Sequence, residues 1–79
     1  MWFVYLIDSK KGVYTGITNN LIRRYYQHQG KIKGGAKFFR GNRPYIVLGY
    51  EIFLNKSDAL KREIQIKKLS REKKRQIFE

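Results

Sequence analysis

Residues 2–18 read WFVYLIDSKKGVYTGIT. The aromatic and branched side chains of residues 2–7 are typical of a strand that is buried on both faces, and residues 13–18 of a second strand. Residues 9–12, with two lysines and a glycine, favour a tight turn between the two strands. This stretch therefore predicts an antiparallel hairpin.

The register of this hairpin places two tyrosines on one face. If the turn centres between Lys10 and Lys11, Tyr5 pairs with Gly16, and Tyr14 lies diagonally from Tyr5. Because Gly16 has no side chain, we expect open space between the two phenols. Two such tyrosines are usually core residues, but they can also deprotonate water or hold a phosphate oxygen.

The chain after residue 18 predicts one more strand and three helices. The remaining elements are, in order, a helix over about 20–29 capped by Thr18 or Asn19, a strand over about 45–53 that follows Pro44, a helix from its cap Ser57 to about Leu69, and a short basic helix capped by Ser70. The Gly-rich basic segment 30–43 is a loop long enough to suggest function. The predicted fold class is α+β, a small three-stranded antiparallel sheet flanked by helices in ββαβαα order.

The first predicted helix carries two candidate catalytic residues. Its apolar arc consists of Leu21, Ile22, Tyr25 and Tyr26. Arg24 and His28 are four residues apart at one edge of this arc, so both can project towards one point. The planar guanidinium of Arg24 suits the charge that grows on a phosphate under attack, although most arginines are surface residues. His28 could instead have only a structural role, in which the partial positive charge of its ring interacts favourably with the C-terminal end of the helix dipole.

The second predicted helix contains a carboxylate in an apolar setting. Ala59, Leu60, Ile64 and Ile66 define its apolar arc, and Glu63 and Lys67 fall inside that arc. An unpartnered carboxylate there is costly. Either Glu63 and Lys67 form an ion pair that reaches outward, or Glu63 ligates a divalent ion together with phosphate oxygens. The sequence leaves both interpretations open.

Length and charge narrow the class of protein. The 79 residues fit one domain, 1–79, without cysteine, which excludes a disulfide framework or a thiolate zinc site. The longest apolar run, residues 2–7, is far shorter than the roughly 18 residues of a membrane-spanning helix, so a cytoplasmic protein is expected. Eighteen Lys and Arg against six acids give a net charge of +12. Residues 9–50 contain no acid, which favours nucleic acid over a membrane surface as the partner.

The expected nucleic-acid contacts lie mostly in the loop. The candidate residues are Lys31, Lys33, Lys37, Phe38, Phe39, Arg40, Arg43 and Lys67. The basic side chains would bind phosphates, and the Phe38-Phe39 pair is the better candidate for stacking on bases.

Several spaced motifs together resemble the GIY-YIG nuclease superfamily. They are Val4-Tyr5-Leu6, Tyr14-Thr15-Gly16, Arg24 ten residues after Tyr14, His28 and the downstream Glu63. Further segments look like the small stand-alone bacterial members and the nuclease domain of structure-specific enzymes that cut branched DNA: Gln27-His28, residues 34–36, Asn42-Arg43-Pro44, and residues 59–63 and 66–70.

The resemblance implies a role for each matched residue. One of Tyr5 and Tyr14 would activate water, Arg24 would stabilise the pentavalent phosphorus, and His28 would assist protonation or bind phosphate. Glu63 would hold one divalent cation, Mg²⁺ or Mn²⁺, as Lewis acid and template.

The function implied is that of a metal-dependent endonuclease. It would hydrolyse phosphodiester bonds in DNA, with RNA as the less favoured substrate, in branched or single-stranded substrates, during repair or recombination. A larger protein partner could supply target specificity. The alternative is a nucleic-acid-binding module without turnover, since many catalytic members carry an asparagine after the metal carboxylate and no Asn follows Asn55.

Overall fold

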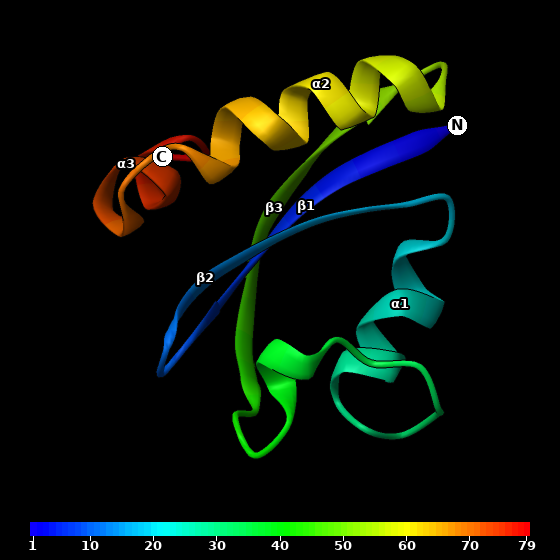
Figure 1. Ribbon diagram of the computed structural model, residues 1–79, viewed down its shortest axis with the longest axis vertical. Coiled ribbons are helices and arrows are strands. Elements are labelled where there is room, and N and C mark those ends of the chain that lie inside the picture. Colours follow the sequence, from blue (N-terminus) through cyan, green and yellow to red (C-terminus); the bar gives the residue numbers. More distant parts are fainter.

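The computed structural model describes residues 1–79 apart from the side chain of Tyr45. The elements are β1 (Trp2–Ser9), β2 (Gly12–Thr18), α1 (Leu21–His28), the 3₁₀ turn η1 (Lys37–Phe39), β3 (Pro44–Phe53), α2 (Lys56–Lys67) and α3 (Arg71–Gln76) (Figure 1). Three antiparallel strands and three helices confirm the predicted α+β class and element order. Among the residues described, no helix has the length and apolar character to cross a membrane.

The three strands form one sheet in the order β2-β1-β3, with β1 at its centre. Tyr5 pairs with Gly16 and Ile7 with Tyr14, which confirms the predicted hairpin register. Along β1, Val4, Leu6 and their neighbours Tyr5 and Ile7 are all at most 2% exposed. Because successive side chains of a strand point to opposite faces, both faces of β1 are covered, as predicted.

Helices α2 and α3 cover one face of the sheet. Val4, Leu6 and Val13 from the hairpin pack against Ala59 and Ile66 of α2. Ile77 and Phe78, which follow α3, pack against the same cluster. This layer buries the apolar face of α2 and forms the larger of the two cores.

The opposite face of the sheet is covered by α1 and the loop that follows it. Tyr5, Ile7 and Phe39 form the buried centre of this second cluster, with Tyr14 and Tyr25 packed around it. Figure 1 shows α1 and α2 on opposite sides of the strands. The candidate catalytic tyrosines therefore belong to the α1 side of the sheet.

Asparagines cap the two longer helices where other residues were expected. The Asn20 side chain accepts a hydrogen bond from the Arg23 N–H, 3.1 Å away, while the hydroxyl oxygen of Thr18 accepts one from the Asn20 N–H. Asn55 likewise caps α2 by accepting from the Asp58 N–H. The expected caps Thr18, Asn19 and Ser57 are wrong by one or two positions because asparagine is an equally good cap. The prediction that Ser70 caps α3 is confirmed.

The loop between α1 and β3 is tied to the hairpin turn. Asn42, only 5% exposed, donates from Nδ2 to the Ser9 hydroxyl and to the Phe38 carbonyl, 3.1 Å in each case. These contacts hold η1 against the sheet, so that Phe39 joins the second cluster. The loop therefore covers the face of the sheet that carries Tyr5 and Tyr14.

Candidate active site

Tyr5 occupies the space above Gly16. A Cβ atom at Gly16 would lie 2.5 Å from the Tyr5 hydroxyl oxygen and 2.9 Å from Cε2 of Tyr14. The expectation of open space between the phenols is therefore wrong: the Tyr5 ring leans over the glycine and fills it. Glycine is required at this position because any side chain would collide with both rings.

The Tyr5 hydroxyl is hydrogen-bonded to His28, the last residue of α1. The Tyr5 oxygen and His28 Nε2 are 2.8 Å apart, and both residues are at most 3% exposed. The other ring nitrogen of His28, Nδ1, accepts a hydrogen bond from the Ala36 N–H at 3.3 Å. In a neutral imidazole one nitrogen accepts and the other carries the proton, so Nε2–H donates to the Tyr5 oxygen.

Burial keeps both partners of this hydrogen bond neutral. Desolvation and, to a lesser extent, the nearby positive charge of Arg24 together lower the pKa of His28 to about 4. Desolvation also raises the pKa of Tyr5 far above its usual value, an effect that Tyr14 reinforces and that Arg24 partly opposes. At neutral pH the pair is therefore an uncharged imidazole donating to an uncharged phenol.

Tyr14 lies beside this pair and is more accessible. Its ring centroid is 6.1 Å from that of Tyr5 and 5.0 Å from that of His28. Tyr14 is half-buried, whereas Tyr5 is 2% exposed. Of the two phenols, Tyr14 is the one that solvent or a substrate can approach.

Arg24 is held between the loop and the phenols. Its Nη1 donates to the Gly34 carbonyl at 2.6 Å and to Oε1 of Gln27 at 2.9 Å. Burial disfavours the charged form of Arg24, but its interactions with the hydroxyl groups of Tyr5 and Tyr14 outweigh this effect and raise its pKa. The guanidinium is thus a fixed positive charge beside both phenols.

A polar hollow of about 290 Å³ opens beside this guanidinium. Arg23, Arg24, Gln27 and Asn20 are among its lining residues. Two positive charges and uncharged hydrogen-bonding groups make this hollow suitable for a phosphate.

The structure thus brings Tyr5, Tyr14, Arg24 and His28 together, and places Glu63 in the other layer. Glu63 lies on α2, whose buried face packs on the opposite side of the sheet. Its carboxylate is 15% exposed and lies 3.5 Å from Nζ of Lys67, in the i,i+4 pair that the sequence allowed as one interpretation.

The position of Glu63 on α2 can be read from its neighbours. Arg62 forms an ion pair with Glu51 of β3 at 2.7 Å, so this flank of α2 faces β3. Glu63 follows 100° further round the helix, beyond the sheet-facing Ala59 and Ile66, and therefore lies on the flank towards β2. Of the strands described, β2 is an edge strand, so no further strand lies between that flank and the open side of the sheet.

A single carboxylate matches only one mode of metal binding. Within the described residues no group of three or more His, Cys, Asp or Glu side chains gathers around a common point. Mg²⁺ is often held by one or two carboxylates, with water and substrate phosphates completing its shell. Glu63, largely buried and paired only with a lysine that is half-exposed, fits this substrate-dependent mode.

The predicted nucleic-acid contacts divide into exposed basic residues and packed aromatic ones. Lys31, Lys33, Lys37, Arg40, Arg43 and Lys67 are all exposed. Phe39 is 7% exposed, and its ring centroid lies 4.6 Å from His28 and 5.0 Å from Tyr14. The expectation that Phe39 stacks on a base is wrong for this structure, because its faces are already covered. Phe38 is half-buried against Tyr14.

Sequence reasoning missed the residues that position the catalytic set. Gln27 holds Arg24, and the Ala36 N–H fixes the tautomer of His28. A Cβ atom at Gly35 would collide with the Gln27 carbonyl, so this glycine lets the loop approach α1 closely. The available signals were Gln27-His28 and the Gly-Gly-Ala segment 34–36, which carried part of the family resemblance but did not indicate these positioning roles.

Comparison with known proteins settles the family. A family model described as the GIY-YIG catalytic domain matches residues 1–76. The chain belongs to the GIY-YIG family. Membership in this family indicates a nuclease, and hence a protein that binds nucleic acid.

Relatives of the GIY-YIG chain include proteins of similar size. A UPF0213 protein from Cupriavidus pinatubonensis is 46% identical over 71 residues, which cover 87% of this chain and 76% of that protein. Another from Halobacterium salinarum is 40% identical over 79 residues, covering 99% of this chain and 100% of that protein. The solution NMR structure of a UPF0213 protein from Bacillus halodurans matches with a TM-score of 0.56 and 38% identity, covering 98% of this chain and 82% of that chain. The predicted resemblance to small stand-alone members is confirmed.

Proposed function

We propose that the protein is a metal-dependent endonuclease that hydrolyses phosphodiester bonds in DNA, in repair or recombination. The observation that carries this proposal is the convergence of two phenols, a neutral imidazole and a fixed guanidinium at one end of α1. In the reaction, a water molecule gives up a proton as its oxygen forms a new bond to phosphorus, the bond from phosphorus to one sugar oxygen breaks, and that sugar oxygen takes up a proton.

We assign to Tyr14 the role of activating the attacking water by taking its proton. Tyr5 accepts the Nε2–H of His28, and burial keeps its pKa high, so Tyr5 holds its own proton and serves as a donor. Tyr14 is more accessible than Tyr5 and lies beside the guanidinium of Arg24, where a substrate phosphate can reach both side chains.

Arg24 supplies the electrostatic part of the mechanism. Its guanidinium is held in place by Gln27 and Gly34, so no reorganisation is needed when charge grows on the phosphate. The polar hollow beside it has room for the phosphate group. His28 acts through Tyr5, which it orients by hydrogen bonding.

Glu63 is the residue that would hold the divalent ion, Mg²⁺ or Mn²⁺. When bound, such an ion would act as a Lewis acid and stabilise charge on the phosphate and the leaving oxygen. The largely buried carboxylate on the β2 flank of α2 supports this assignment. Substitution of Glu63 by Gln keeps its size and removes the charge, so it separates ion binding from packing.

The test is cleavage of labelled single-stranded, flap and junction DNA, and of matching RNA, with Mg²⁺ or Mn²⁺. Wild-type protein should nick DNA, and EDTA should stop the reaction. Tyr14→Phe, Arg24→Ala and Glu63→Gln should each lower the rate by about 100-fold or more. Cleavage that survives all three substitutions would show that these residues are not the active site.

Two matched variants control for loss of charge alone. Lys61 is an exposed basic residue on α2, away from the polar hollow, and Glu72 is an exposed acid on α3. Lys61→Ala and Glu72→Gln should keep most of the activity. If the wild type binds DNA in EDTA but cleaves none of the substrates with either metal, the protein is a binding module, which is the alternative function.

A further inference from the structure

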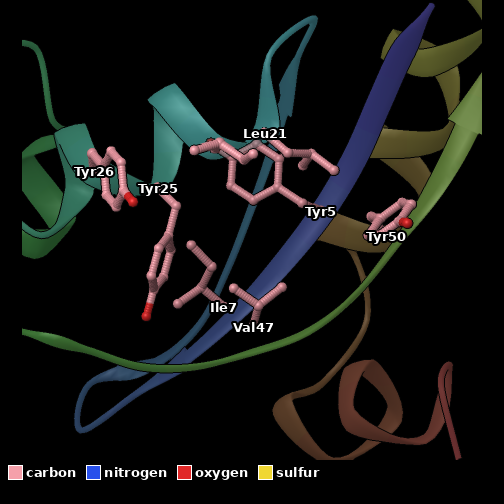
Figure 2. Close-up of a pocket in the computed structure, with 8 residues that line it drawn as sticks. Tyr5, Ile7, Leu21, Tyr25, Tyr26, Val47 and Tyr50 are labelled. Atoms are coloured by element: carbon pink, nitrogen blue, oxygen red, sulfur yellow. The ribbon is translucent and has the colours of Figure 1, made fainter.

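An aromatic pocket of about 460 Å³ lies next to the candidate active site, between α1 and the β1–β3 half of the sheet. The residues that line it include Tyr5, Ile7, Tyr25, Tyr26, Val47 and Tyr50. Figure 2 shows them gathered around the space, with Tyr25 and Tyr26 on the α1 side and Val47 and Tyr50 on β3. A pocket of this size falls in the range of small-ligand sites.

The pocket exists because α1 does not cover the β3 half of its sheet face. Ile22 and Tyr26, expected in the buried arc of α1, are 70% and 44% exposed. Tyr50, directly opposite Tyr5 in the sheet, is 49% exposed, and Val47 is 40% exposed. Exposed aromatic surface of this extent beside the candidate active site of a small protein indicates a binding surface.

The charges around the pocket favour a nucleotide as its occupant. Nζ of Lys31 lies 5.3 Å from the centroid of the Tyr26 ring, and Arg24 lies beside the hydroxyl of Tyr5. Aromatic walls with a basic rim match a group that has both an aromatic face and a phosphate. A second copy of this chain would instead bring another +12 net charge against the same surface.

Tyr5 connects the pocket to the candidate active site. Its ring lines the pocket, while its hydroxyl oxygen accepts the hydrogen bond from His28. The Tyr5 ring itself is covered, being 2% exposed, so a base would rest on the exposed rings of Tyr26 and Tyr50, with its own phosphate towards Arg24. In a duplex the bases are paired and stacked, so only an unpaired nucleotide can enter.

We infer that this pocket binds an unstacked base of single-stranded DNA, next to the phosphate that is cut. The inference rests on the proposed nuclease function and adds the site that would select unpaired nucleotides at single strands, flaps or junctions. Base stacking on Tyr26 and Tyr50 then provides affinity that does not depend on sequence, because every base has an aromatic face.

The test compares binding to a thymidine oligonucleotide with binding to an abasic oligonucleotide of equal length. Fluorescence anisotropy in EDTA at one fixed salt concentration measures affinity without cleavage. Both ligands have the same phosphates, so their affinity ratio isolates the bases. The wild type should prefer the base-containing strand by about fivefold or more, as expected for at least one stacked base.

Two variants locate that preference. Tyr50→Ala and Tyr26→Ala should each reduce the affinity ratio towards one. Tyr50 also contacts the ring of Phe3, so Tyr26→Ala tests the pocket even if Tyr50→Ala perturbs folding. Leu54→Ala is the control, because Leu54 is apolar and 86% exposed but lies outside the pocket. The control should keep the full ratio.

Three results would overturn the inference. They are equal wild-type affinity for both oligonucleotides, an unchanged ratio in both tyrosine variants, and a wild-type dimer in sedimentation that Tyr50→Ala dissociates. The cleavage assay separates this inference from the proposed function. A protein that prefers the base-containing strand but does not cleave DNA would support the base-binding pocket and contradict the nuclease function. A protein that cleaves DNA but shows no base preference would support the nuclease function and contradict the base-binding pocket.

Discussion

The hydroxyl oxygen of Tyr5 and Nε2 of His28 lie 2.8 Å apart although 23 residues separate them in the chain. This buried hydrogen bond joins the central strand to the end of α1. The bond ties the end of α1 to the sheet beside Tyr14, while the Ala36 N–H fixes the tautomer of His28 and burial keeps both groups uncharged. One contact therefore serves the fold and the proposed chemistry together.

The pH dependence of stability should report the burial of His28. An unfolded histidine takes up its proton near pH 6.5, whereas the folded imidazole, with its pKa lowered to about 4, does not. The unfolded state thus binds more protons in this window, so the free energy of unfolding is highest above about pH 6.5 and falls as the pH drops towards 4. Urea unfolding between pH 5 and 7 measures this slope above the range where most carboxylates titrate.

The matched variant for that experiment is His28→Gln, whose side-chain amide can still donate to Tyr5. This variant should be less stable at pH 7, and its free energy of unfolding should change little between pH 5 and 7. A wild-type slope that persists unchanged in the variant would show that another group causes it.

Removal of the two phenolic hydroxyls should have different effects on stability. Tyr5→Phe leaves the buried Nε2–H of His28 without its acceptor, which should cost about 1–3 kcal/mol of unfolding free energy. Tyr14→Phe should cost less than about 1 kcal/mol, because Tyr14 is only half-buried. Urea unfolding of both proteins tests this order, and an equal or reversed cost would contradict the hydrogen-bond assignment.

Gly16→Ala should displace the Tyr5 ring. The new Cβ would lie 2.5 Å from the Tyr5 oxygen and 2.7 Å from its Cζ. Overpacking of this kind costs about 1–3 kcal/mol, and we expect cleavage to be lost with it. In the double variant Gly16→Ala/Tyr5→Phe the oxygen contact is absent, so the added cost of the alanine should be smaller. A strictly additive double variant would mean that the two positions do not interact.

Asp8 should stabilise the packing of α3 on the hairpin. Its side chain is 13% exposed and forms ion pairs with Arg71 at 3.3 Å and Arg75 at 2.6 Å. Because both arginines are about half-exposed, Asp8→Asn should lower the unfolding free energy by only about 1 kcal/mol, and 1 M salt should shrink the difference. Glu72→Gln, an exposed charge on the same helix, should have a smaller effect. Equal effects of the two variants would contradict the role of Asp8.

Much of this fold follows from local sequence signals. The unbroken apolar run of β1 and the turn at 9–12 fix the hairpin and its register, which places Tyr5 opposite Gly16. The four-residue spacing of Arg24 and His28 places both at one edge of one helix. These two relationships join residues that are close in sequence or connected by a short turn, so strand and helix periodicity is sufficient to predict them.

Other features depend on long-range packing and were not predictable. Burial of Phe39 depends on Asn42, whose side chain reaches back to Ser9. The exposure of Ile22 and Tyr26 depends on where α1 lies above the sheet, and helix periodicity cannot give that position. Likewise, the arc of α2 correctly placed Glu63 near the core, but nothing in the sequence indicates which face of the sheet α2 covers.

The measurement that tests the central claim most directly is single-turnover cleavage of single-stranded DNA with Mg²⁺ by wild type, Tyr14→Phe and Tyr5→Phe, at a temperature where all three are folded. We predict that Tyr14→Phe loses essentially all cleavage. Tyr5→Phe should retain cleavage at a reduced rate, because loss of the hydrogen bond to His28 leaves the active-site side chains less firmly positioned. Full activity of Tyr14→Phe would contradict the account, since it would show that the accessible phenol beside Arg24 takes no part in the reaction.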